Sequence, residues 1–277
     1  MESTLKRIIL LTIITFFSGC NTQNLTNNSK LGKIAKKFET NGNKLIEAAL
    51  NDTLGFSRLA DMCDTFGPRF SGSDNLEKAL DWILKEMKAD GLENVHAEDV
   101  MVPKWVRGNE SAQMISPWKK NLDMLGLGGS IGTGPNGITS EVVVVSSFED
   151  LEARASEAKG KIVLFNVPFT SYGQTVQYRS GGAIAASKAG ALGSIIRSVG
   201  PFSMNTPHTG GMRYEEGVRK IPHAAITVED AAMIARMVNR GQSVKIKLYM
   251  EGKFEPDALS RNVMGEITGS EFPNEVI

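Results

Sequence analysis

The segment Lys161-Ile-Val-Leu-Phe-Asn166 decides the fold class, because its short apolar run predicts a β-strand. The segment Gly181–Gly190 comes next, is rich in small residues, and predicts a helix that ends at a glycine. Ser194-Ile-Ile-Arg-Ser198 then predicts a second strand. A strand, a helix and a strand in this order are typical of an α/β domain.

The surrounding sequence extends the same α/β pattern. Strands are expected at 141–145, 222–227 and 244–250, and helices at 148–158 and 228–239, the latter capped by Thr227 with Asp230 three residues on. From about Leu122 to Met250 these elements make a module of about 125 residues, which is an ordinary size for one domain.

The section before this module predicts helices followed by one strand. The first helix covers Leu31–Leu50 and is interrupted near Asn41-Gly42. The next two helices are capped by Asp52 or Thr53 and by Ser73 or Asp74, and the strand covers 94–106. The apolar stripes of these helices need a sheet or other helices to pack on, and this section has too few strands to supply that sheet.

The last stretch, from Ser260, predicts a strand at Val263–Ile267 and a turn at 269–274. A second apolar run begins at Glu275 and contains the last residues of the chain. Finished proteins usually cover or charge an unpaired strand edge. We therefore expect this chain to be the front part of a longer protein.

The N-terminus predicts an export signal. Lys6 and Arg7 precede the apolar run Ile8–Phe17, and Ser18-Gly19-Cys20 follows. The stretch ending at Cys20 resembles a bacterial lipoprotein box with Phe17 where Leu is usual, so Cys20 is the expected lipid anchor and 21–30 a polar tether. The alternative is an ordinary cleaved signal peptide in which Cys20 has no role. The protein is then exported, either as a lipoprotein facing the periplasm or on the outer surface, or in secreted form.

The charge balance bears on partners. Lys and Arg together number 31, as do Asp and Glu. Nucleic-acid binding depends on an excess of Lys and Arg, so no nucleic-acid partner is expected. Contact with a membrane is expected only through the lipid anchor, and a homodimer is left open.

Several catalytic motifs fail in this sequence. Gly128-Gly-Ser130-Ile-Gly132 has the spacing of a nucleophile elbow, which needs a helix after Ser, but Gly-Thr-Gly-Pro follows. The surrounding glycines include no Gly-Lys-Ser/Thr, so they form no phosphate-binding loop. The three histidines lack the spacing of a zinc-binding helix.

One loop remains as a candidate site. His208 and Thr209 lie in Asn-Thr-Pro-His-Thr-Gly-Gly211, which is rich in hydrogen-bonding groups, and we expect them to face a substrate. His96 is expected on the surface and His223 in a structural role. Polar residues of uncertain meaning flank loops nearby: Tyr172, Tyr178, Arg179 and Arg213.

Three segments together resemble a protease-associated (PA) domain: 160–165, 181–190 and 221–230. Other motifs resemble the carboxypeptidase Q (plasma glutamate carboxypeptidase) family, in the same order as in that family: 66–73, 75–82, 90–94, 102–108, 206–210 and 260–263. The resemblance covers roughly 31–277.

The resemblance implies an α/β zinc-exopeptidase sandwich domain, incomplete here, with a PA-type α/β domain inserted into it. The expected parts are a signal peptide and lipobox (1–20), a tether (21–30), a first peptidase segment (31–121), the PA domain (122–252) and a truncated return to the peptidase domain (253–277). The substrates would be dipeptides or short peptides, and two zinc ions about 3.5–4 Å apart would activate water, with a Glu as general base.

The family's zinc ligands and catalytic Glu fall after the strand that this chain enters last. The resemblance therefore assigns no catalytic or metal-binding residue here, zinc belongs to the full-length protein, and the chain is expected to be inactive alone. The alternative is a short PA-domain lipoprotein that binds a peptide or a protein. A third reading is that a separate chain supplies the missing part.

Overall fold

The computed structural model describes residues 32–202 and 205–276. The predicted signal peptide, Cys20 and the tether lie outside the described residues. The chain divides into two compact units between Ala60 and Asp61, and each is described by itself. In the described part, no helix is both long and apolar enough to cross a membrane.

The first unit holds α2 (Lys33–Asn51) and the start of α3 (Leu54–Phe66). Helix α2 runs through Asn41-Gly42, so the predicted interruption is wrong. One Gly and one Asn cost about 1 kcal/mol or less each in a helix, and the good helix formers around them offset that cost. Asp52 accepts a hydrogen bond from the Leu54 amide (2.8 Å) where α3 begins. Neither helix contains a buried residue.

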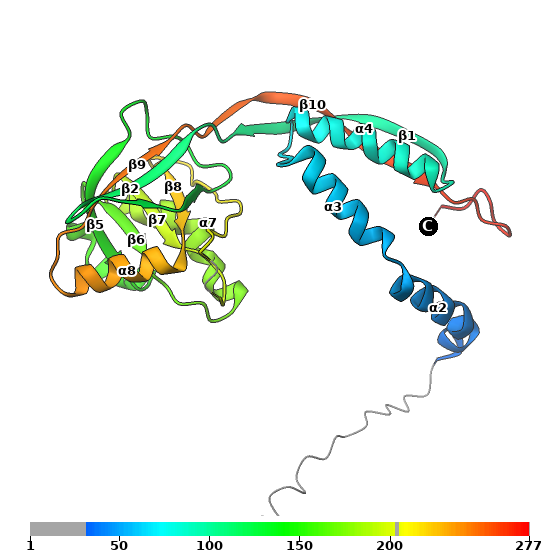
Figure 1. The fold of residues 1–277 in the computed structure, drawn as a ribbon, viewed down its shortest axis with the longest axis horizontal. Coiled ribbons are helices and arrows are strands. Elements are labelled where there is room, and N and C mark those ends of the chain that lie inside the picture. Colours follow the sequence, from blue (N-terminus) through cyan, green and yellow to red (C-terminus); the bar gives the residue numbers. More distant parts are fainter. Residues whose placement is uncertain (1–31, 203–204, 277) are drawn as a thin grey trace, which may run out of the picture. The chain divides into compact units, whose positions relative to one another are not determined.

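In the second unit, the end of α3 is followed by α4 (Asp74–Ala89), which contacts a two-stranded antiparallel ladder of β1 (Glu93–Val106) and β10 (Lys253–Glu266) (Figure 1). Ser73 caps α4 as expected by accepting a hydrogen bond from the Leu76 amide (3.2 Å). On β10, Arg261 forms ion pairs with Glu77 and Asp81 of α4.

The predicted strand Val263–Ile267 is only the end of β10, which starts at Lys253. The expected strand at Glu275 does not form in the described residues. Glu275 and Val276 follow a turn there, and Val276 is exposed. A strand forms only where another strand supplies its hydrogen bonds, and β10 has β1 as its partner.

Most of the second unit is one eight-stranded sheet with the order β3-β2-β9-β5-β6-β7-β8-β4. Neighbours from β5 to β8 are parallel and the other pairs are antiparallel. The strands are β2 (Glu110–Ser116), β3 (Lys120–Leu122), β4 (Met124–Gly126), β5 (Ile138–Val145), β6 (Ile162–Phe165), β7 (Gly193–Arg197), β8 (His223–Ile226) and β9 (Lys245–Met250).

The sheet includes residues that precede 122, because β2 pairs with both β9 and β3. Strands β3 and β4 stand at opposite ends of the strand order, yet only Asp123 separates them in sequence. The sheet must therefore curl until its two ends lie next to each other. This closure leaves fewer free strand edges.

The helices of this unit follow the sequence pattern with two differences. Helix α8 (Val228–Asn239) has the predicted bounds and the predicted cap, Thr227. The expected helix 148–158 is broken at Arg154 into α5 (Phe148–Ala153) and α6 (Ala155–Ala158). Helix α7 (Tyr172–Lys188) begins well before the predicted Gly181, because Ser171 caps it and Thr175 near its start is buried.

Two buried clusters cover the two faces of the sheet. Alternate residues of β6 divide between them: Ile162 and Leu164 belong to the cluster that contains α8, whereas Val163 and Phe165 belong to the one that contains α5 and α7. The α/β class predicted from the sequence is confirmed, and both faces of this sheet have a complete apolar core.

Candidate functional site

The candidate site lies at the carboxyl ends of the parallel strands. Strands β5 to β8 all end at the same edge of the sheet, and ligands of parallel α/β sheets, open or closed, generally bind at that edge. Asn166 follows β6, Arg197 ends β7, and the loop containing His208 follows β7. The edge therefore gathers polar residues from several parts of the sequence.

Backbone bonds hold the predicted loop at both ends. The His208 amide donates to Ser198 Oγ (2.8 Å), just after β7. The Gly128 amide donates to the Gly210 carbonyl (2.9 Å), and the Met212 amide donates to the Gly128 carbonyl (3.0 Å). The His208 side chain is exposed. The loop is therefore fixed while its histidine faces solvent.

Arg179 of α7 lies against this loop. Its Nη1 donates to the Thr209 carbonyl (3.5 Å), and its Nη2 donates to the Tyr172 hydroxyl (2.9 Å). The guanidinium carbon lies 5.5 Å from the centre of the Tyr172 ring. Nε is buried and has no hydrogen-bond partner among the described residues. The structure thus brings Thr209 and Arg179 together, a contact that no spacing in the sequence indicates.

Two further polar atoms at this edge lack partners in the described part of the chain. They are Oδ1 of Asn166 and Nε of Arg197, and both atoms are buried. Phe165 pairs with Ile196 across β6 and β7, so Asn166 and Arg197 occupy the next positions in that register. Sequence reasoning missed both residues, although a polar residue directly after an apolar strand was the available signal.

His223 and Ser194 have the spacing of a base and a nucleophile but are sealed from solvent. Ser194 Oγ lies 2.6 Å from Nδ1 of His223, whose Nε2 faces the Tyr178 carbonyl (3.2 Å). Both side chains are fully buried, and desolvation lowers the pKa of His223 to about 4. The imidazole is therefore neutral near pH 7. Its place in the core agrees with the structural role predicted for it.

Ser130 is also buried, and it is not followed by a helix. Its Oγ accepts a hydrogen bond from the His223 amide (2.9 Å) and donates to the Ile131 carbonyl (3.0 Å). The nucleophile role rejected from the sequence has no geometric support. His96 lies on the surface of β1, and a hydrogen bond with the Asn94 carbonyl raises its pKa.

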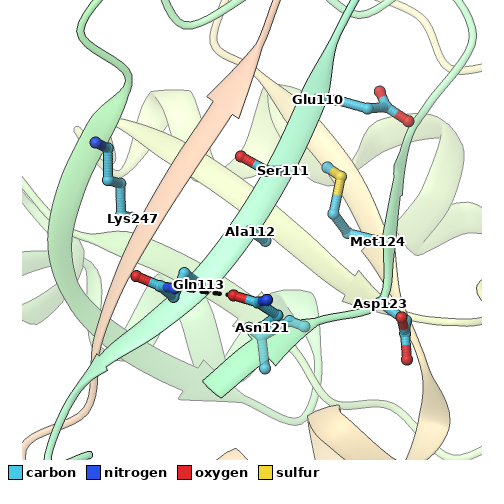
Figure 2. A pocket seen from close by; sticks show the side chains of 9 residues that line it. Glu110, Ser111, Ala112, Gln113, Asn121, Asp123, Met124 and Lys247 are labelled. Carbon is cyan, nitrogen blue, oxygen red and sulfur yellow. Dashed lines mark hydrogen bonds between the residues drawn. The ribbon is translucent and has the colours of Figure 1, made fainter. Parts of the chain in front are cut away.

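A pocket of about 450 Å³ lies beside β2, β3 and the Asp123 link (Figure 2). Its lining is mainly polar and carries both signs of charge: Glu110, Ser111, Ala112, Gln113, Asn121, Leu122, Asp123, Met124 and Lys247. Gln113 and Asn121 bond to each other across it (2.8 Å). This mixture selects no single class of ligand.

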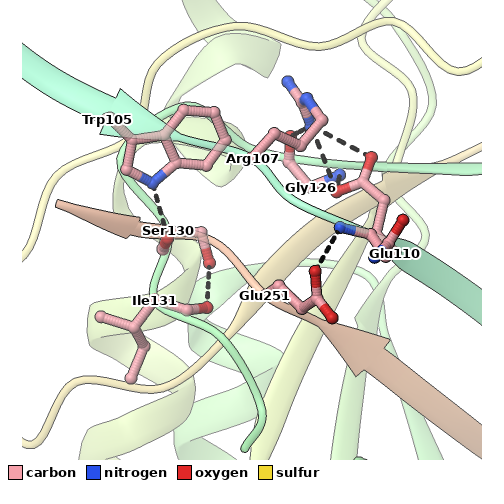
Figure 3. Close-up of polar contacts among 8 residues, drawn as sticks. Trp105, Arg107, Glu110, Gly126, Ser130, Ile131 and Glu251 are labelled. Carbon is pink, nitrogen blue, oxygen red and sulfur yellow. Dashed lines mark hydrogen bonds and ion pairs between the residues drawn. The ribbon is translucent and has the colours of Figure 1, made fainter. Parts of the chain in front are cut away.

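A polar cluster joins the ladder to the eight-stranded sheet where β1 leads into β2 and β9 leads into β10 (Figure 3). Trp105 donates to the Ser130 carbonyl (2.9 Å). Arg107 bonds to Glu110 (3.1 Å) and to the Gly126 carbonyl, and its guanidinium lies 5.1 Å from the Trp105 ring centre. The polar groups of this cluster bond to one another and to nearby carbonyls, so they are available for the connection between ladder and sheet rather than for a ligand. We refer to the cluster as the joint between these two regions.

Among residues 32–202 and 205–276, no group of three or more His, Cys, Asp or Glu side chains is placed to hold a metal ion. We therefore assign no described residue to zinc.

Comparison with known proteins identifies the relatives of this chain. Mouse carboxypeptidase Q is 54% identical over 222 residues, which are 80% of this chain and 47% of the mouse protein. Carboxypeptidase Q of Xenopus laevis is 44% identical over an alignment 282 positions long, which covers 98% of this chain and 60% of that protein. This chain is a homologue of carboxypeptidase Q. It spans about half the length of the curated relatives it matches.

Solved structures agree with this homology. A peptidase M28 precursor from Shewanella amazonensis matches with a TM-score of 0.79 and 36% identity, covering 85% of this chain and 55% of that one. A zinc aminopeptidase from Bacillus subtilis has a TM-score of 0.51 at 21% identity, which shows a likeness of fold. No protein-family model matches the chain. The carboxypeptidase Q resemblance predicted from the sequence is confirmed, and so is the α/β class.

Proposed function

We propose that this carboxypeptidase Q homologue is the N-terminal part of a dinuclear-zinc exopeptidase that hydrolyses short peptides. The observation that carries the proposal is 54% identity to mouse carboxypeptidase Q over 80% of the chain. The segment 122–252, together with β2 and β3 of the same sheet, is proposed as an inserted PA domain, and the rest of 31–121 and 253–277 as parts of the peptidase domain. The proposed location is outside the cytoplasm, with Cys20 as the lipid anchor.

Exposed apolar side chains support a larger peptidase domain. On α2 and α3, Ile34, Phe38, Leu45, Leu50 and Phe56 are each more than half exposed. On the ladder, Met101 and Leu259 are also more than half exposed. Apolar surface gathered in this way usually marks an interface. The rest of a peptidase sheet would cover these side chains.

Zinc would supply an activated water and would polarise the scissile carbonyl. The Bacillus subtilis neighbour of similar fold is a zinc aminopeptidase, which supports this choice of metal. No ligand is assigned to this chain. The contribution proposed for this chain is the loop with His208 and Thr209. Hydrogen bonds of its backbone hold the loop in place, and the loop would face the peptide.

The test is the purified 277-residue chain, assayed for peptide hydrolysis with and without zinc. No hydrolysis is expected, because the zinc ligands and the base would lie elsewhere. Zinc-dependent hydrolysis by this chain alone would refute the proposed division. The coding DNA after Ile277 should continue in frame, and the longer product should hydrolyse short peptides.

A second candidate is a binding module, and one observation favours it. The eight-stranded sheet has an apolar core on both faces within this chain. A stop codon directly after Ile277, with stable expression of the short protein, would favour a lipoprotein that binds peptide or protein through this unit. Co-purification of a separate second chain would favour complementation instead.

A further inference from the structure

The segment 127–132, which contains the motif that fails as a nucleophile elbow, connects two parts of the second unit. On one side, the Trp105 indole of the ladder donates from Nε1 to the Ser130 carbonyl (2.9 Å) (Figure 3). On the other side, Gly128 forms hydrogen bonds through its amide (2.9 Å) and its carbonyl (3.0 Å) with residues at the end of the loop 206–211. We call 127–132 the glycine segment. The ladder and the loop are therefore linked through two residues of one short segment.

Close packing explains the glycines of this segment. A Cβ on Gly132 would lie 2.5 Å from the Met250 carbonyl oxygen of β9, which is closer than real Cβ atoms come. Gly129 has a φ of +90°, a backbone conformation that side chains disfavour, and a Cβ there would lie 3.6 Å from the Phe254 ring of β10. The glycines therefore let the segment lie directly against β9 and β10, which gives the motif a structural role.

The glycine segment is held too firmly to move in part. The Ser130 hydroxyl accepts a hydrogen bond from the His223 amide (2.9 Å). The Ile131 amide donates to the Tyr214 hydroxyl (2.9 Å), which in turn donates to the Ile221 carbonyl (2.8 Å). A shift of the Ser130 carbonyl would strain these bonds. It would therefore be passed along the segment to the loop that is bonded to it.

Trp105 is fixed on the ladder side. Its indole is buried and contacts the Phe70 ring edge to face, with centroids 5.7 Å apart. The Arg107 guanidinium lies 5.1 Å from the centre of the indole ring. An indole has a single N–H donor, and a buried donor that loses its acceptor is costly. The bond to Ser130 therefore sets the distance between the ladder and the glycine segment.

The two stretches that lead from the ladder into the eight-stranded sheet are bonded to each other. They are 107–109 and 251–252, and each contains a glycine, as hinges often do. The Asn109 amide donates to the Glu251 carboxylate (2.7 Å), and the Glu251 amide donates to the Asn109 carbonyl (3.1 Å). A Cβ on Gly108 would lie 2.6 Å from Cβ of Glu251. Because the two stretches have no room to turn about each other, the joint holds the ladder in place rather than letting it swing.

We propose that Trp105 is a positioning residue, which acts through the glycine segment to hold the loop 206–211 at a fixed place relative to β10. The proposal rests on the proposed function, in which β10 belongs to the peptidase domain and the loop faces the peptide. The peptide would then meet a loop that is already in place, which lowers the entropy lost on binding. Loss of the indole N–H would loosen the loop without removing a group that touches the peptide.

The test is amide hydrogen exchange of the ¹⁵N-labelled 277-residue chain, followed by NMR. Trp105→Phe keeps an aromatic ring and removes the N–H group. We expect it to speed the exchange of the Gly128 and Met212 amides by about tenfold, because both bonds depend on the position of the segment. Amides inside α8 should keep their protection. The matched control is Trp118→Phe, which changes an exposed tryptophan and should leave both amides as they are.

Unchanged exchange of both amides in a folded Trp105→Phe chain would overturn the proposal, and so would an equal effect of Trp118→Phe. Where Trp105→Phe melts early and all amides exchange faster, the parent chain gives a second measurement. In the parent, the Trp105 indole N–H and the Met212 amide should open with the same free energy. An indole N–H that is protected at least about tenfold less than this amide would overturn the proposal.

The longer product adds a readout that a purely structural residue would not move. Trp105→Phe should raise KM for a short peptide about threefold or more at nearly unchanged kcat, whereas loss of folded enzyme alone would lower the apparent kcat at constant KM. An unchanged KM would refute the positioning role and keep the proposed function. A longer product that never hydrolyses peptides would refute the proposed function, while faster exchange at Gly128 and Met212 would still show that Trp105 positions the loop.

Discussion

The eight-stranded sheet and the two-stranded ladder belong to the same unit, yet they bury their apolar residues very differently. The eight-stranded sheet has two enclosed cores, with side chains such as Ile234 and Phe165 almost fully buried. The ladder and its helix α4 bury few apolar residues, and Met101 and Leu259 of the ladder are largely exposed. The eight-stranded sheet therefore encloses its own apolar cores, whereas the ladder leaves apolar side chains open to contact with another surface.

The difference follows from topology. A curled sheet of eight strands with helices on both faces can enclose apolar side chains, and burial contributes roughly 25 cal/mol for each Å² of apolar surface removed from water. A two-stranded ladder with one helix can cover only one of its faces, and isolated two-stranded pairs are marginally stable in water. The experiments below test this contrast.

The largest effect is expected for Phe165→Ala, compared with Phe38→Ala. Phe165 is 1% exposed and packs against the rings of Phe148 and Tyr178, with centroids 5.5 and 5.7 Å away. Its loss should lower the free energy of unfolding by about 3–5 kcal/mol. Phe38 of α2 is 53% exposed, so its replacement should change stability by about 0.5 kcal/mol or less. Urea unfolding followed by circular dichroism measures both changes.

A large loss of stability in Phe38→Ala would show that α2 is already covered in this chain, and the contrast between the two regions would fail. Limited proteolysis gives a second view of the same contrast. Cleavage before β2 should be rapid while the sheet from β2 to β9 resists, and equal resistance throughout would contradict a missing partner surface.

The next effect concerns pH and the buried His223. Burial lowers its pKa from 6.5 to about 4, so the unfolded chain takes up a proton at a pH where the folded chain does not. The stability that this group contributes is full above pH 6.5 and is lost as pH falls from 6.5 toward 4. A shift of this size corresponds to about 3 kcal/mol.

The measurement is the free energy of unfolding at pH 7 and pH 4.5 for the parent chain and for His223→Gln. The variant should lose less stability between these pH values, because its side chain does not titrate. Parallel pH curves for the two chains would show that His223 does not govern this part of the acid response.

These contacts also show how far the sequence could predict the molecule. The bounds of α8 were predictable because its cap and its apolar face lie within the helix itself. The start of α7 was not, because Gly173, Gly181 and Gly182 suggest a weak helix. Gly182 has a structural cause, since a Cβ there would lie 3.0 Å from the His223 ring.

Other features depend on partners far along the chain. The first half of β10 contains charged residues and Pro256, a poor strand pattern, but it pairs with β1 across a register irregularity that accommodates the proline. The candidate site has the same character. His208 and Thr209 could be named from their loop, whereas the position of Arg179 depends on the Thr209 carbonyl, thirty residues away.

A smaller effect is expected at the joint between the two regions. Arg107→Met removes the ion pair with Glu110, the bond to the Gly126 carbonyl and the contact with the Trp105 ring. Glu110 keeps its bond from the Gly126 amide (3.0 Å), so the loss should be about 1–2 kcal/mol. Protease should cut faster near 107–109 and 251–252, separating the ladder from the sheet. Arg240→Met is the exposed control, and equal cutting in both variants would show that Arg107 does not secure the joint.

The smallest effect distinguishes the two regions by their helix caps. Thr227 caps α8 with a bond from the Asp230 amide (3.1 Å) and is fully buried, whereas Ser73 caps α4 with a bond from the Leu76 amide (3.2 Å) and is partly exposed. Replacing either residue by Ala should cost about 1 kcal/mol of helix stability. In Thr227→Ala the cost should appear in the unfolding of the whole eight-stranded unit, because α8 belongs to its core. In Ser73→Ala it should appear only as faster amide hydrogen exchange within α4. Equal global destabilisation by both variants would contradict this prediction, because it would show that the ladder and the sheet unfold together.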